Sequence, residues 1–331
     1  MILMIVAHWK RIEFLLRLGV GVGIIFFLFK FVPYQELILY TKNANLLILF
    51  LSLVVFFLTN LLAVLRWKVV ISTLGIKAKF KNLFFTFFSG LFFNLFFPSL
   101  IAGDIFRGLS LAGRDYQETY DYKKKIAASV IMDRAAGFLA LSFLACVSFF
   151  LAPSGVKTKS IYLSLGIILL FSFSLLLFIF SRTFFRILTY FLTFFPRWQK
   201  KAYGFHNHLY LFRKKQKNFF TIIGISLLIQ IMSALSFVVA GIGFGVKANY
   251  FLFFVLVPII SIVAALPLTV GGLGTREAAA LFFFSQIGID KPLALGISLM
   301  NFVSLSAMGI LGGIFYALFH HRWIQSYKEK S

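Results

Sequence analysis

The chain has 331 residues, of which 60% are hydrophobic and 13% are charged. A soluble domain of this length must wet its surface, so this composition excludes a soluble enzyme or binding module. The net charge of +23 would suggest nucleic acid as the partner of a soluble chain. In a membrane protein, however, Lys and Arg gather in cytoplasmic loops near anionic lipid, and we expect no nucleic-acid partner.

Eight apolar segments follow one another along the chain and predict an all-α, polytopic membrane protein. Six are long enough to cross a bilayer: residues 12–32, 44–65, 126–151, 161–181, 219–240 and 292–318. Two others, 83–101 and 250–289, are interrupted by polar residues, proline and glycine. We treat residues 1–331 as one membrane domain with halves at about 12–151 and 161–318. The most basic loop, 182–218, lies in the second half.

The first interruption, at residues 94–107, departs from the pattern of a lipid-facing helix. Asn94 and Asp104 are polar, Pro98 lacks a backbone donor, and Arg107 follows Asp104 by three residues, on one face of any restarted helix. Irregular backbone survives in hydrocarbon only where protein or a water-filled cavity surrounds it. We therefore predict a site, in which Arg107 binds a lipid phosphate and Asp104 orients it, binds a cation or carries a proton. The alternative is a structural ion pair.

A second charged pair, Asp133 and Arg134, lies near the start of the 126–151 span. Adjacent helical residues point about 100° apart, so these two side chains cannot simply neutralise each other. Arg134 could face a central cavity while Asp133 pairs elsewhere, or Arg134 could extend to the membrane interface. Arg66, with Trp67 and Lys68, follows the 44–65 span in the pattern of an interfacial anchor.

The second interruption, at residues 267–277, combines glycines with an adjacent charged pair: Gly271, Gly272, Gly274, Arg276 and Glu277. Glycines let backbone N–H groups approach an anion, and a helix starting near Thr275 would add its positive end. A charged pair at this depth is costly unless it is used. The alternative is a simple break between two helices.

Charge distribution predicts that both interrupted segments are re-entrant. If residues 83–101 enter the membrane and return, both termini and all three basic loops lie on one face, which the positive-inside rule makes cytoplasmic. The other face then carries few basic residues: Lys30, Lys42, Lys157, Lys159, Lys247 and Lys291. The segment 250–289 would enter from that other face. Opposed broken helices in the two halves are typical of transporters built on inverted repeats.

Metal and catalytic motifs do not emerge from the sequence. The histidines lie in predicted loops or tails without helix-spaced acidic partners: His8, His206, His208, His320 and His321. No nucleophile motif or Asp-rich magnesium loop is evident, so we expect no metal, no cofactor and no catalytic residue.

The combination of these motifs resembles the flippase-like transmembrane domain of lysylphosphatidylglycerol synthases. The resemblance rests on the run from Asn94 to Arg107, the Asp133-Arg134 pair followed by Gly137, and the run from Pro267 to Glu277. It covers residues 12 to 318 and implies the binding or movement of a polar-headed lipid. Arg107, Arg134 and Arg276 are the best matches to functional positions. The synthases carry a soluble aminoacyl-transferase domain after the membrane part, whereas this sequence stops at Ser331, so we do not expect synthase activity.

The leading hypothesis is a flippase-like protein that translocates an anionic or polar-headed lipid across the cytoplasmic membrane. Its partner would be a phospholipid or a polyprenyl-linked lipid, and a homodimer is one arrangement open to the chain. No ATP-binding motif is evident, so movement would be facilitated or ion-coupled. The alternatives are a membrane-embedded enzyme of the glycosyltransferase type and a non-catalytic partner of a lipid synthase.

Overall fold

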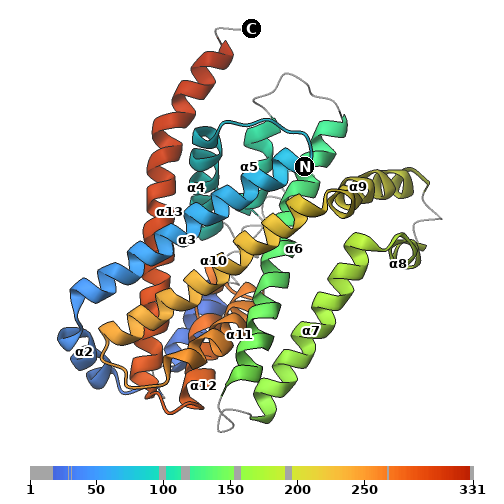
Figure 1. Cartoon of the computed structure of the whole chain (residues 1–331). Helices are drawn as coiled ribbons and strands as arrows, with labels where there is room; N and C mark the ends of the chain where they lie inside the picture. The colour runs from blue at the N-terminus through green and yellow to red at the C-terminus, as the bar shows by residue number, and fades with distance from the viewer. Residues whose placement is uncertain are drawn as a thin grey trace.

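The computed structural model places the chain in a bundle of long helices with shorter helices between them (Figure 1). It describes residues 18–28, 30, 32–96, 102–112, 120–152, 158–190, 196–266 and 268–328. Within these ranges the ordered elements are helical, which confirms the predicted all-α class.

Five helices of the described chain are long and apolar enough to cross a membrane. They are α3 (Leu46–Thr73), α6 (Tyr120–Leu151), α7 (Lys159–Phe180), α10 (Gln216–Gly243) and α13 (Lys291–Lys328). These confirm five of the six predicted spans. Of the sixth, 12–32, the structure describes a helix over Leu18–Leu28. A short helix, α2 (Tyr34–Asn43), follows it.

The first interrupted segment is an antiparallel helical hairpin made of α4 (Phe80–Phe96) and α5 (Ala102–Ala112). The ring centroids of Phe93 and Phe106 lie 4.3 Å apart, and Asn94 Oδ1 accepts from the Gly103 N–H at 2.8 Å. The restarted helix on which Asp104 and Arg107 would share a face is therefore present, as α5. Because Asp104 and Arg107 share one face of α5, this segment can be helical and still hide its charges.

The second interrupted segment is also a hairpin. It consists of α11 (Phe253–Ala265), a 3₁₀ turn η4 (Val270–Gly272) and α12 (Thr275–Ser285), with a short turn η3 (Tyr250–Leu252) before it. The rings of Phe253 and Phe284 lie 4.8 Å apart, which brings the start of α11 to the end of α12. The prediction of a helix starting near Thr275 is confirmed.

The two hairpins enter the bundle from opposite ends (Figure 1). The pair α4–α5 lies at the end where α3 finishes and α6 begins, and α11–α12 lies where α10 finishes and α13 begins. Each half therefore consists of a span, a hairpin and a second span: α3, α4–α5 and α6 in the first half, and α10, α11–α12 and α13 in the second. Because α3 packs antiparallel to α10, the two halves run in opposite directions. This is the order that an inverted-topology repeat requires.

Small residues bring α13 close against α4. A Cβ atom at Gly312 would lie 1.9 Å from the Phe88 carbonyl oxygen, and one at Gly313 would lie 2.7 Å from the Phe92 ring. Gly309 meets Leu95 in the same way. Small residues on one helix face allow this close packing, and Gly312 makes the nearest approach.

The basic loop 182–218 contains two helices, α8 (Arg182–Leu188) and α9 (Pro196–Lys214), at the side of the bundle. His206 of α9 is 1% exposed, stacks on Phe185 at 4.1 Å, and lies 3.0 Å from the Phe178 carbonyl oxygen through Nε2. Burial lowers the pKa of His206; the Phe178 hydrogen bond opposes this shift, and the positive charge of Arg182 adds to it. A neutral imidazole therefore docks α9 onto α7 and α8.

Candidate functional site

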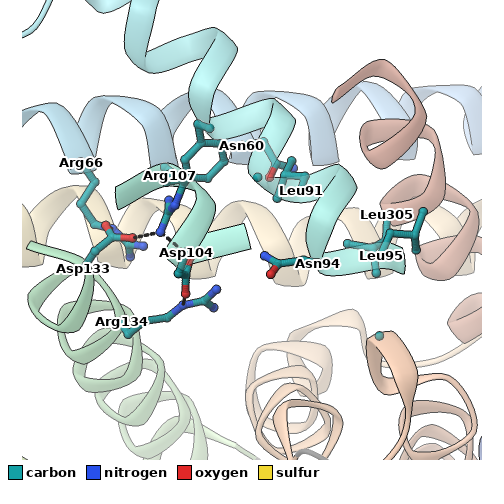
Figure 2. A pocket seen from close by; sticks show the side chains of 14 residues that line it. Asn60, Arg66, Leu91, Asn94, Leu95, Asp104, Arg107, Asp133, Arg134 and Leu305 are labelled. Carbon is teal, nitrogen blue, oxygen red and sulfur yellow. Dashed lines mark hydrogen bonds and ion pairs between the residues drawn. The ribbon is translucent and has the colours of Figure 1, made fainter. Parts of the chain in front are cut away.

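Five charged side chains from three helices form one network, in which all but Arg134 are buried (Figure 2). Arg107 Nη2 donates to Asp104 Oδ1 at 2.6 Å within α5, and Arg134 Nε of α6 donates to Asp104 Oδ2 at 2.6 Å. Asp133, also on α6, accepts from Arg66 Nε of α3 at 2.7 Å and lies 3.5 Å from Arg107 Nη2. We call these five residues the arginine cluster.

Arg66 is the member of this cluster that the sequence interpretation missed. Arg66 is 8% exposed and Trp67 is 0% exposed, so the prediction of an interfacial anchor here was wrong for both residues. Arg66 Nη1 also donates to the Ser226 hydroxyl of α10 at 3.2 Å. The signal was the apolar run Val69–Ile71 after Lys68, which continues the helix to Thr73 and draws Arg66 into the membrane.

Arg107 is held by aromatic rings as well as by carboxylates. Its guanidinium carbon lies 4.8 Å from the Trp67 ring and 4.7 Å from the Phe87 ring, in cation–π contact with both. Its Nε is buried without a hydrogen-bond partner among the described residues. These contacts fix the guanidinium between Asp104 and Asp133, so Arg107 serves both carboxylates at once.

Arginines outnumber aspartates among the five members of the arginine cluster, three to two. Arg134 is the most accessible member: its side chain is 57% exposed, whereas that of Asp104 is 3% exposed. A guanidinium has five N–H donors, so an exposed one that already holds a carboxylate can donate to a further anion as well.

The cluster lies deep in the bundle. Asp133 is nine residues after Lys124, which opens the apolar part of α6, and this corresponds to about 14 Å along a helix. Ser226, the partner of Arg66, is ten residues into α10, or about 15 Å. Arg66 itself is seven residues, or about 10 Å, before the end of α3. The hydrocarbon core of a bilayer is about 30 Å thick, so these depths place the cluster inside the membrane-spanning part of the bundle.

Two glycines position the cluster by letting α4 and α5 touch. A Cβ atom on Gly103 would lie 2.0 Å from the Gly90 carbonyl oxygen, and one on Gly90 would lie 2.8 Å from Arg107 Cγ. Asn94 then accepts from the Gly103 N–H, which places α5 at a fixed height on α4. Gly103 has a helical backbone, so its role is to allow the close approach of α4 and α5.

A cavity of about 270 Å³ opens beside the cluster. Its polar lining comes from the five cluster residues with Asn60 and Asn94, and its remaining lining includes Gly271 of the second hairpin (Figure 2). The structure thus brings together Asn94, Asp104, Arg107, Asp133, Arg134 and Gly271, which the sequence predicted as separate motifs. Arg134 faces this cavity, as one of its two predicted orientations requires. Pro98 lies outside the described residues.

The other predicted residues of the second hairpin form a separate arrangement. The backbone of Gly271, Gly272 and Gly274 has positive φ angles of 61°, 74° and 90°, which favour glycine. The Glu277 carboxylate accepts from the Gly274 N–H and from Ser298 of α13, and it caps α12. Among the described contacts, no ion pair joins Glu277 to its neighbour Arg276.

Arg276 is 7% exposed and uses one guanidinium nitrogen to hold the hairpin turn. Its Nη2 donates to the Gly271 carbonyl oxygen at 2.7 Å, and its Nη1 is buried with no hydrogen-bond partner in the described chain. Arg276 therefore stiffens the turn that carries Gly271 into the cavity lining. The predicted anion-binding role of the glycine run stays a prediction, since the Gly274 N–H is occupied by Glu277.

Comparison with protein families decides the relationship of the chain to known proteins. A family model described as the lysylphosphatidylglycerol synthase TM region matches residues 14–313. The chain belongs to this family. Membership in the lysylphosphatidylglycerol synthase TM family makes it an integral membrane protein connected with lipid synthesis or lipid flipping. No curated protein and no solved structure matched the chain.

Proposed function

We propose that the protein binds the phosphate-bearing head group of a membrane lipid at the arginine cluster and translocates that lipid across the membrane. The observation that carries this proposal is the exposed side chain of Arg134, which lines a cavity together with the other four charged members of the cluster. By the positive-inside rule, the face with the basic loops is the cytoplasmic face of the cytoplasmic membrane.

The energetics of burial support a ligand rather than a purely structural network. Charges within a membrane are costly, and a structural pair would balance its charges. Within its five members this cluster instead holds three arginines and two aspartates, and its most exposed arginine lines a cavity. A head-group phosphate at Arg134 would bring negative charge to this arginine-rich site. Hydrogen bonds to charged groups contribute about 1.5–3 kcal/mol each toward such binding.

The two opposed hairpins support movement as well as binding. The cavity is lined by α4 and α5 from one end of the bundle and by Gly271 from the hairpin that enters at the other end. In transporters with inverted repeats, rocking of one repeat against the other opens a site between them to each side in turn. A lipid head group could cross here while its tails stay in the bilayer.

The test is lipid translocation by the purified full-length protein in liposomes. Fluorescent phosphatidylglycerol would be placed in both leaflets, and the fraction that an external reductant cannot bleach would be followed with time. We expect the wild-type protein to make nearly all the label accessible, and Arg134→Gln to slow this at least tenfold.

Arg186→Gln is the matched control, because it removes the same charge from an exposed position on α8. The control should translocate lipid at the wild-type rate. If folded wild-type protein leaves the inner leaflet protected, or if Arg134→Gln and Arg186→Gln behave alike, the proposal is wrong.

A further inference from the structure

A second cavity, of about 560 Å³, runs along the side of α6 that faces α7, α10 and α11. We call it the α6 groove. Its lining is mainly apolar and includes Val130, Ile131, Phe138, Leu141, Phe171 and Leu175. The rings of Phe138 and Phe171 lie 4.8 Å apart and join α6 to α7 across it.

The α6 groove opens sideways toward lipid. Both α7 and α11 pack against α6, but they make little contact with each other in the described structure, and α7 stands at the edge of the bundle (Figure 1). At the opening, Ile131 is 40% exposed and Phe171 is 55% exposed, whereas Leu141 and Ile229 deeper in the groove are buried. In a bilayer, lipid chains would meet this opening.

Charge at its inner end distinguishes the α6 groove from an ordinary lipid-facing surface. Four residues of the arginine cluster line both this groove and the 270 Å³ cavity: Arg66, Asp104, Asp133 and Arg134. The exposed part of the Arg134 side chain lies where the apolar groove meets the polar cavity. A surface that only faced acyl chains would not lead to charged groups, because their exposure to hydrocarbon is costly.

The α6 groove is long enough for much of one acyl chain. Its lining on α6 extends from Val130 to Leu141, eleven residues or about 17 Å of helix. Half of the hydrocarbon core of a bilayer is about 15 Å. Arg134 lies seven residues, or about 10 Å, before Leu141, so a head group beside the guanidinium would leave about 10 Å of the adjoining chain in the groove.

We infer that the α6 groove holds one acyl chain of a phosphate-bearing lipid whose head group contacts Arg134, and that the lipid enters sideways between α7 and α11. This inference rests on the proposed function and specifies its substrate class. The ligand is an amphiphile that the protein contacts at both its head group and its acyl chain. A soluble phosphate ester has the head group alone and lacks the chain that the groove would hold. The arginines select the anionic end, and the groove selects for a chain.

The test uses phosphatidylglycerol that carries a diazirine midway along one acyl chain, with the full-length protein in phosphatidylcholine vesicles. Leu175→Trp would fill the groove from α7. Leu170→Trp is its matched control, because Leu170 is on the same helix, is 70% exposed and does not line the groove. Ala265→Trp fills the groove from α11 and serves if Leu175→Trp does not fold.

We expect light-induced cross-links on groove residues of α6, α7 or α11, reduced at least tenfold by Leu175→Trp and unchanged by Leu170→Trp. Glycerol phosphate should compete at least tenfold less well than unlabelled phosphatidylglycerol. Equal competition by the two would overturn the groove, because it would mean that the head group alone is bound.

Translocation by the same variants separates this inference from the proposed function. In one outcome Arg134→Gln abolishes translocation, but the two groove variants, Leu175→Trp and Ala265→Trp, cross-link and translocate lipid as well as the control Leu170→Trp. The groove assignment is then wrong, and the proposed function stands. If cross-links form in the groove but Arg134→Gln leaves both cross-linking and translocation intact, the proposed role of the arginine cluster fails.

Discussion

Arg66 and Arg134 each donate through Nε to one aspartate of the arginine cluster, yet they differ in burial, so the same substitution should affect them differently. The side chains of Arg66 and its partner Asp133 are 9% and 3% exposed. Removing one partner of a buried pair costs about 3–5 kcal/mol, because the other charge is left uncompensated. Asp133 keeps Arg107 at 3.5 Å, so we expect Arg66→Gln to cost about 3 kcal/mol, at the lower end of this range.

Arg134→Gln should cost far less stability. Its side chain is 57% exposed, and after its removal Asp104 keeps Arg107 at 2.6 Å. Asp104 therefore does not become an uncompensated charge, so the loss should lie well below the ~3–5 kcal/mol of a broken buried pair. The variant should therefore fold almost as well as the wild type and lose mainly lipid binding, which makes Arg134 the better residue for functional tests.

The free energy of unfolding can be measured by circular dichroism in mixed micelles, with increasing mole fractions of dodecyl sulfate. Arg66→Gln combined with Asp133→Asn is the control for charge balance. The double variant should recover part of the loss, since no carboxylate is left without its partner. Equal losses for Arg66→Gln and Arg134→Gln, or no loss for Arg66→Gln, would refute the difference in burial on which this reasoning rests.

Three further predictions concern packing, pH and topology. Gly103→Ala should lower the free energy of unfolding by about 2 kcal/mol or more, since its Cβ would lie 2.0 Å from the α4 backbone. Gly166→Ala on α7 is the control and should not destabilise the protein, because its Cβ would meet nothing within 4 Å. The pKa of His206 is lowered in the folded state, so the free energy of unfolding should be constant above about pH 6.5 and should fall below it, where the unfolded state takes up protons. His206→Phe should remove this dependence on pH, and a flat profile for the wild type would contradict the prediction. Cysteine at position 79 should react with impermeant reagent only from the cytoplasmic side and cysteine at Lys247 only from the other; labelling of both from one side would exclude the opposed hairpins.

The sequence was most informative where a charged residue stands within an apolar segment, because burying such a charge is costly and few arrangements can compensate for it. Asp104 and Arg107 stand three residues apart in an apolar region, so their pairing on one helix face was predictable and is confirmed at 2.6 Å. Adjacent Asp133 and Arg134 could not pair with each other, and the structure gives them different partners. The helical membrane class followed from length and hydropathy alone.

Tertiary structure decided which charges meet. Arg66 is 67 residues from Asp133 in the chain, and its position after an apolar segment fits an interfacial anchor equally well until the packing of α3, α6 and α10 is known. The sequence allowed a restarted helix at Asp104 and Arg107, but its return along α4 was not evident, because the polar face of α5 is turned onto other charges instead of water. Local pattern reports the cost of burying a residue, whereas only packing supplies the partner that offsets that cost. For this chain, the sequence by itself determined that charge lies within the membrane, and the fold determined that three arginines share two aspartates beside a cavity.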